Sequence, residues 1–87
     1  MSEAGSVADW LHRRRAFGAA VAARRKNVGL SQWQLADRAG YDRQSINRIE
    51  HAMFSTLLDR LWRLAEALEC PLSELIADVE ARLDGTP

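Results

Sequence analysis

Four polar side chains lie within six residues of the sequence, and their chemistry suits hydrogen bonding to nucleic-acid bases. Arg43 and Arg48 end in guanidinium groups, and Gln44 and Asn47 end in carboxamides. A guanidinium matches the major-groove edge of guanine, and a carboxamide matches that of adenine. These groups can act together only if the local structure places them on one exposed face.

The 20-residue segment SQWQLADRAGYDRQSINRIE, which begins at Ser31, predicts that local structure. Ser31 is followed three residues later by a glutamine, the capping box that begins many helices, and Asp42 supplies a second capping side chain eleven residues on. Gly40 lies between the two caps, where a helix terminator is expected. We therefore predict helices over about 32–39 and 43–51, joined by a tight turn, as in a helix-turn-helix.

The apolar residues of the second predicted helix decide which of its faces is buried. Ile46 and Ile49 are three residues apart and therefore share a face. If that face packs inward, the four base-matching side chains must occupy the opposite side and the N-terminal end of the helix. The sequence thus predicts one polar, basic surface on this helix.

Three further helices complete the predicted fold, because apolar residues recur at helical spacing through the rest of the chain. They are expected over about 9–27, 57–68 and 71–83. In the first of them Trp10, Phe17 and Val21 stand at near-heptad spacing. The result is an all-α, compact five-helix domain over residues 9–83, with flexible tails at 1–8 and 84–87.

Charge is unevenly distributed along this chain of zero net charge. Residues 1–50 hold nine Lys and Arg against five Asp and Glu, a balance of +4, and residues 51–87 hold three against seven, a balance of −4. The span 13–48 contains all nine basic residues of the first half and only two acidic ones. The positive charge therefore accompanies the predicted helix-turn-helix, where it can attract phosphates in a salt-dependent way.

The sequence contains no arrangement of residues that is typical of a catalytic site or a metal site. His12 and His51 do not stand at ligand spacing from the single cysteine, and no glycine-rich phosphate loop occurs. Cys70 is expected to be a buried apolar residue. We predict no enzyme activity, no catalytic or metal site, no cofactor and no small-molecule ligand. No segment is apolar enough to cross a membrane, and a cytoplasmic protein, nucleoid-associated when bound, is expected.

Five segments together resemble the Cro and lambda-type repressor class of DNA-binding domains, often called Xre-like. The segments are GLSQ (29–32), LADRAG (35–40), SINRIE (45–50), RLAEAL (63–68) and PLSEL (71–75). They occur in the family's order and at its usual spacing. The resemblance implies a lambda-repressor-like fold that binds DNA through the second helix of the motif.

The resemblance also implies roles for individual residues. Arg43 and Gln44 match positions that enter the major groove, and Gln32 matches a phosphate clamp. Positions that read bases or the flanking backbone are matched by Asn47 and Arg48. An ion pair between Arg25 and Glu50 is implied as a purely structural contact, which removes both residues from the surface that meets DNA.

Further phosphate contacts are expected from side chains around these positions. They are Ser45, Arg24, Lys26 and Trp33. Arg24 replaces a residue that is usually apolar in the family, so it either snorkels or meets DNA. Trp33 replaces a polar residue and either rests against the sugar-phosphate backbone or covers the core. Ala52 and Thr56 replace the family's glycine and proline, so the 52–56 loop either extends the preceding helix or takes an unusual path.

The expected function is that of a sequence-specific regulator of transcription that binds double-stranded DNA at a pseudo-palindromic operator. A homodimer is expected because the last helix carries an apolar stripe that extends beyond the needs of the domain's own core. The stripe consists of Leu72, Ile76, Val79 and Leu83, and parts of the preceding helix are expected to contribute to the interface. Small proteins of this build resemble restriction-modification controller proteins and phage repressors.

An alternative function belongs to another class, that of protein-interaction modules. A toxin-neutralising antitoxin with secondary DNA binding is one example. The −4 balance of residues 51–87 and the exposed character of Met53 and Phe54 favour it.

Overall fold

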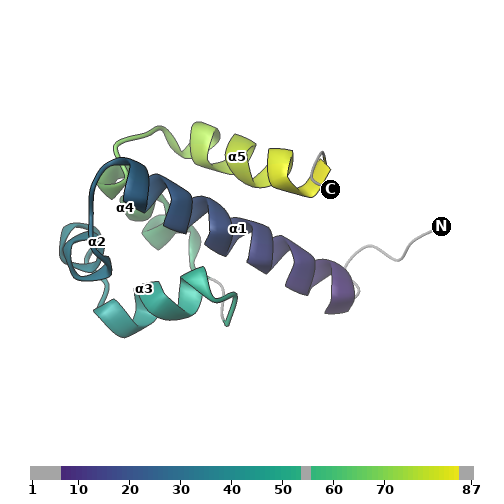
Figure 1. Cartoon of the computed structure of the whole chain (residues 1–87), viewed down its shortest axis with the longest axis horizontal. Helices are drawn as coiled ribbons and strands as arrows, with labels where there is room; N and C mark the ends of the chain where they lie inside the picture. Colours follow the sequence, from purple (N-terminus) through teal and green to yellow (C-terminus); the bar gives the residue numbers. More distant parts are fainter. Residues whose placement is uncertain (1–6, 54–55, 85–87) are drawn as a thin grey trace.

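The computed structural model describes residues 7–53 and 56–84. These residues form five helices and no strand, which confirms the predicted all-α architecture (Figure 1). The helices are α1 Val7–Asn27, α2 Gln32–Ala39, α3 Arg43–Glu50, α4 Leu58–Ala67 and α5 Leu72–Asp84.

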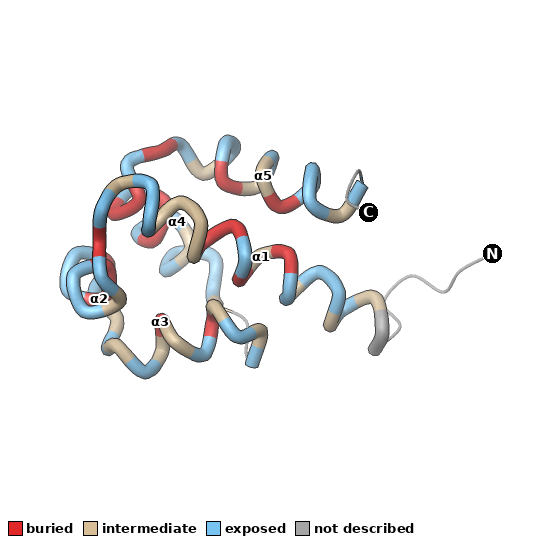
Figure 2. Tube along the Cα trace, in the orientation of Figure 1, coloured by how far each residue is buried: buried red, intermediate tan, exposed pale blue. Residues whose placement is uncertain are grey.

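The long helix α1 is the centre of the arrangement. It contacts α5 along one side and α3 along another, while α2 packs against α3 and α4. Helices α1 and α5 run side by side in opposite directions (Figure 1). The buried residues line the inner sides of all five helices (Figure 2). The most deeply buried large side chains are Val21, Leu35, Ile46, Ile49, Leu64, Leu68 and Leu75.

The predicted helix caps around the turn are confirmed. The Ser31 hydroxyl accepts a hydrogen bond from the Gln34 backbone N–H at 3.0 Å, and the Gln34 side chain accepts one from the Ser31 N–H at 2.8 Å. The Asp42 carboxylate accepts from the Ser45 N–H at 2.7 Å. Gly40 ends α2 in the left-handed conformation, with φ of 73°. This local chemistry fixes the angle at which α3 follows α2.

Helix α3 ends at the start of the 52–56 loop, for which the sequence allowed either a longer helix or an unusual path. Ala52 takes the left-handed conformation, with φ of 60°, in the place of the family's glycine. The Ala52 N–H donates to the Ile49 carbonyl at 3.1 Å, and the Met53 N–H donates to the Arg48 carbonyl at 2.8 Å. These two bonds form a Schellman motif. The loop therefore closes α3 as a glycine would, while residues 54 and 55 lie outside the described residues.

The helix limits differ from the predicted ones by small amounts. Helix α1 begins at Val7, so the predicted tail at 1–8 overlaps it, and α5 extends to Asp84. Helix α4 begins after Leu57, which caps it without a side-chain hydrogen bond. Hydroxyl capping is only one of several ways to begin a helix, because water can satisfy exposed N–H groups.

A close crossing of α1 and α3 holds the motif against the long helix. A Cβ added at Gly18 would lie 2.4 Å from the Ile49 carbonyl oxygen and 2.8 Å from that of Glu50. Only a glycine lets the two backbones approach this closely. The end of α3 is therefore positioned directly by the α1 backbone.

The predicted inward positions of α1 and the predicted outward stripe of α5 need correction. Trp10 is 53% exposed, although its spacing suggested packing. On α5, Val79 is 8% exposed and belongs to the core, and Leu72 and Leu83 pack against that core. The expectation that the stripe extends beyond the domain's own core is wrong, because α1 is long enough to cover it. Ile76 remains half-buried.

Candidate nucleic-acid interface

The outer face of α3 carries the four side chains that the sequence singled out. Ile46 and Ile49 are 0% and 1% exposed, so the predicted inward face is confirmed. Gln44 and Arg48 are exposed, and Arg43 and Asn47 are half-buried. We call the four residues Arg43, Gln44, Asn47 and Arg48 the α3 face.

Gln32, the first residue of α2, joins the α3 face to the interior. Its Oε1 accepts hydrogen bonds from Arg43 Nη1 at 3.3 Å and from Asn47 Nδ2 at 3.4 Å. Its Nε2 donates to Glu50 Oε1 at 3.0 Å. One carboxamide thus connects two residues of the α3 face to a nearly buried carboxylate.

The ion pair implied by the resemblance is present behind Gln32. Arg25 donates to both carboxylate oxygens of Glu50, from Nε at 2.7 Å and from Nη2 at 3.1 Å. The two side chains are only 12% and 6% exposed. Arg25 Nη1 also donates to the Leu30 carbonyl oxygen at 2.9 Å. Because both charges are held inside the domain, the pair ties α1 to α3 and supports Gln32.

Trp33 and Ser45 lie beside the α3 face. Trp33 is 70% exposed, and the guanidinium carbon of Arg43 lies 5.5 Å from the centre of its ring. Ser45 is half-buried, and its backbone N–H completes the Asp42 cap. That hydrogen bond lowers the pKa of the Asp42 carboxyl. Lys26 is exposed in the last turn of α1.

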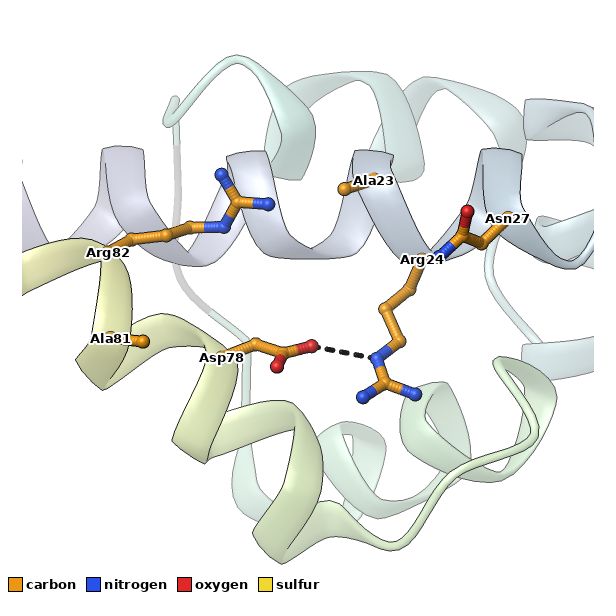
Figure 3. A pocket seen from close by; sticks show the side chains of 6 residues that line it. All are labelled: Ala23, Arg24, Asn27, Asp78, Ala81 and Arg82. Atoms are coloured by element: carbon orange, nitrogen blue, oxygen red, sulfur yellow. Dashed lines mark hydrogen bonds and ion pairs between the residues drawn. The ribbon is translucent and has the colours of Figure 1, made fainter. Parts of the chain in front are cut away.

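Arg24 lies elsewhere and is engaged within the chain. Its Nε donates to Asp78 Oδ2 at 2.8 Å (Figure 3). Its Nη1 lies 2.9 Å from Glu74 Oε2. The hydrogen bond to Asp78 raises the pKa of Arg24. The arginine therefore joins α1 to α5, which accounts for a charged residue at a position where the family has an apolar one. We leave it out of the phosphate contacts.

An apolar surface at the start of α4 is exposed to solvent. Leu57, Leu58 and Trp62 are 69%, 64% and 52% exposed. They could have been found in the sequence, because they exceed the one apolar stripe that α4 needs to pack against the core. Leu64, Ala65 and Leu68 already supply that stripe.

A family model that matches most of this fold identifies the family of the chain. The helix-turn-helix family model matches residues 21–75, from the middle of α1 into α5. The chain belongs to the helix-turn-helix family. The matched span contains all five segments of the Xre-like resemblance, which confirms that resemblance.

Solved structures of other helix-turn-helix proteins share this fold. The restriction-modification controller protein C.AhdI from Aeromonas hydrophila is 32% identical over 71% of this chain and 94% of its own, with a TM-score of 0.69. Two structures of the clp gene regulator ClgR from Corynebacterium glutamicum have TM-scores of 0.78 and 0.76 at 18% and 19% identity. They cover 82% and 86% of this chain and 76% and 96% of their own. Among curated proteins, none matches this chain.

Membership of this family defines the general class of function. The helix-turn-helix protein is a DNA-binding regulator of transcription, and it is not an enzyme. Its α2 and α3 both lie within the span that the family model matches. In the part of the chain that the structure describes, no helix is long and apolar enough to cross a membrane.

Proposed function

We propose that this helix-turn-helix protein recognises a specific double-stranded DNA sequence by placing α3 in the major groove. The observation that carries the proposal is the convergence of Gln32, Arg43 and Asn47 at one exposed surface, where their side chains lie within hydrogen-bonding distance. Arginine and carboxamide side chains are the usual readers of guanine and adenine. The surface continues into exposed Gln44 and Arg48.

The contacts divide into base reading and backbone positioning. Arg43 and Gln44 lie at the N-terminal end of α3, the end that enters the groove in this motif, and we assign them to base edges. Asn47 and Arg48 follow one turn later and read bases or the flanking backbone. Phosphates are assigned to three side chains around α3. These are Gln32, Ser45 and Lys26.

The test of DNA binding also separates the two classes of function. Binding of a random-sequence duplex should be detectable by fluorescence anisotropy at about 50 mM salt and should weaken steeply toward about 200 mM, because the contact releases counterions. If the duplex does not bind at the lower salt concentration, the proposed DNA interface is wrong and the protein-interaction function is favoured instead. Met53, which is 66% exposed, is the observation that favours that alternative.

The acidic second half of the chain gives the alternative less support than its charge suggested. Three of its seven acidic residues already form ion pairs within the chain. Glu74 and Asp78 pair with Arg24, and Glu69 pairs with Arg38 at 3.1 Å. Part of the negative charge is therefore already paired within the chain.

We also propose a homodimer, whose interface is centred on the exposed apolar surface of α4 and on Ile76 of α5. Two shallow apolar grooves meet at Ile76. One is bordered by Arg13 and Arg14, and the other by Glu66 and Glu80. A two-fold axis between the grooves would bring the arginines of one copy toward the carboxylates of the other. Such a surface is self-complementary, as a two-fold interface must be.

The dimer would match a pseudo-palindromic operator. Two copies related by a two-fold axis present two α3 helices, and half-site centres are expected about one helical turn, or roughly 34 Å, apart. In vitro selection of bound duplexes should therefore return sequences with two-fold symmetry. A selected consensus without such symmetry would contradict the dimeric mode of binding.

Trp62→Glu is the variant that tests the interface. We expect it to be monomeric in sedimentation at concentrations where the wild type is dimeric, because it places a charge in the apolar centre of the interface. Trp62 is half exposed within its own chain, so the fold should tolerate the change. Trp33→Glu is the matched control when sedimentation is run without DNA, since Trp33 is 70% exposed and lies outside both grooves. A dimer that survives Trp62→Glu would exclude this interface.

A further inference from the structure

Trp33 presents an unusually large apolar side chain to solvent at the edge of the α3 face. It is the second residue of α2, and 70% of it is exposed. It does not contribute to the buried core. The contact that the structure gives its ring is with Arg43, whose guanidinium carbon lies 5.5 Å from the ring centre. This distance is within the range of a cation–π interaction.

Arg43 is consequently held from two directions. The indole ring of Trp33 contacts the guanidinium, and Gln32 Oε1 accepts a hydrogen bond from Nη1 at 3.3 Å. Gln32 is itself fixed by its 3.0 Å hydrogen bond to Glu50. An arginine on an open helix surface samples many rotamers, and the side-chain entropy lost when one rotamer is fixed opposes binding. The contacts with Trp33 and Gln32 restrict the rotamers of Arg43 before any duplex is bound.

We propose that Trp33 is a positioning residue that sets the direction of the Arg43 guanidinium and thereby determines base specificity at the position Arg43 reads. The proposal rests on the DNA-binding function above. It differs from the expected phosphate contact of Trp33, because a contact with the sugar-phosphate backbone would strengthen binding to every duplex equally. A residue that orients a base-reading side chain affects the operator and leaves other sequences unchanged.

The test compares three variants on the selected operator and on a scrambled duplex of the same length. Trp33→Leu removes the aromatic face, and Trp33→Phe keeps one. Trp33→Leu should lower the ratio of operator to scrambled affinity by about three- to tenfold, and Trp33→Phe should restore most of it. Trp10→Leu, which removes an exposed tryptophan far from α3 in sequence, should leave the ratio unchanged. Equal losses on both duplexes for Trp33→Leu would overturn the proposal.

A second readout needs no DNA. The side-chain protons of Arg43 should be shifted upfield in the NMR spectrum of the free protein by the Trp33 ring current. The shift should disappear in Trp33→Leu and persist in Trp33→Phe. If the Arg43 resonances do not respond to Trp33→Leu, the proposal fails even when the wild type binds its operator. If the wild type binds no duplex, the proposed function fails, whatever the Arg43 resonances show.

Discussion

Replacing Glu50 with alanine should lower the free energy of unfolding by about 3–5 kcal/mol, the range found when one partner of a buried ion pair is removed. The carboxylate is 6% exposed and accepts three hydrogen bonds, two from Arg25 and one from Gln32. Its loss leaves the Arg25 guanidinium, 12% exposed, with only the Leu30 carbonyl among these contacts. A buried cation without its counter-charge is strongly unfavourable.

Thermal unfolding followed by circular dichroism measures this effect, and Glu69→Ala is its control. Glu69 pairs with Arg38 at 3.1 Å, but the two side chains are 59% and 47% exposed, so its removal should cost less than about 1 kcal/mol. The double variant Arg25→Met with Glu50→Met should recover part of the loss, because no buried charge is left unpaired. Equal unfolding midpoint temperatures for Glu50→Ala and Glu69→Ala would contradict this prediction, because the buried pair would then contribute no more stability than the exposed pair.

The same variant should also weaken DNA binding in the fraction that remains folded. Without Glu50, Gln32 Nε2 loses its acceptor, and the carboxamide that holds Arg43 and Asn47 becomes free to turn. The ion pair therefore acts on the α3 face through Gln32, although neither of its charges is expected to touch DNA.

Local chemistry explains why the helix-turn-helix could be predicted from the sequence. Ser31, Asp42 and Gly40 act within one turn of their own positions, so their residue types suffice to place the ends of α2 and α3. The outward direction of the α3 face followed from the spacing of Ile46 and Ile49, which needs no knowledge of the partner helices. Both inferences rest on interactions between residues close in the sequence.

Contacts between distant segments explain what the sequence left unpredicted. Arg24 meets Asp78 across 54 residues, and nothing in the local pattern indicates that pairing. The apolar stripe of α5 is longer than a small core needs, but α1 is 21 residues long and packs against most of it. The contact of the Arg43 guanidinium with the Trp33 ring depends on how the turn brings the starts of α2 and α3 together, so residue types alone could not reveal it.

Arg43→Ala and Gln44→Ala carry the second large expected effect. Each should weaken binding to the selected operator by about 1–3 kcal/mol, or roughly 5- to 150-fold, because each removes hydrogen bonds to a base edge. Stability should change little. Gln44 is exposed, and Arg43 makes its hydrogen bond and ring contact at the surface of the domain. The preference for the base at the corresponding position should also relax, and repeating the selection with each variant measures that change.

The most direct test of DNA reading by the α3 face is the affinity of four proteins for the selected operator, measured side by side by fluorescence anisotropy. They are the wild type, Arg43→Ala, Gln44→Ala and the control Arg38→Ala, which removes an exposed arginine of α2 that pairs with Glu69. We predict that the two α3 variants lose affinity by the amounts above and that the Arg38 variant stays near the wild type. Unchanged affinity in both α3 variants would contradict the claim that the α3 face reads DNA.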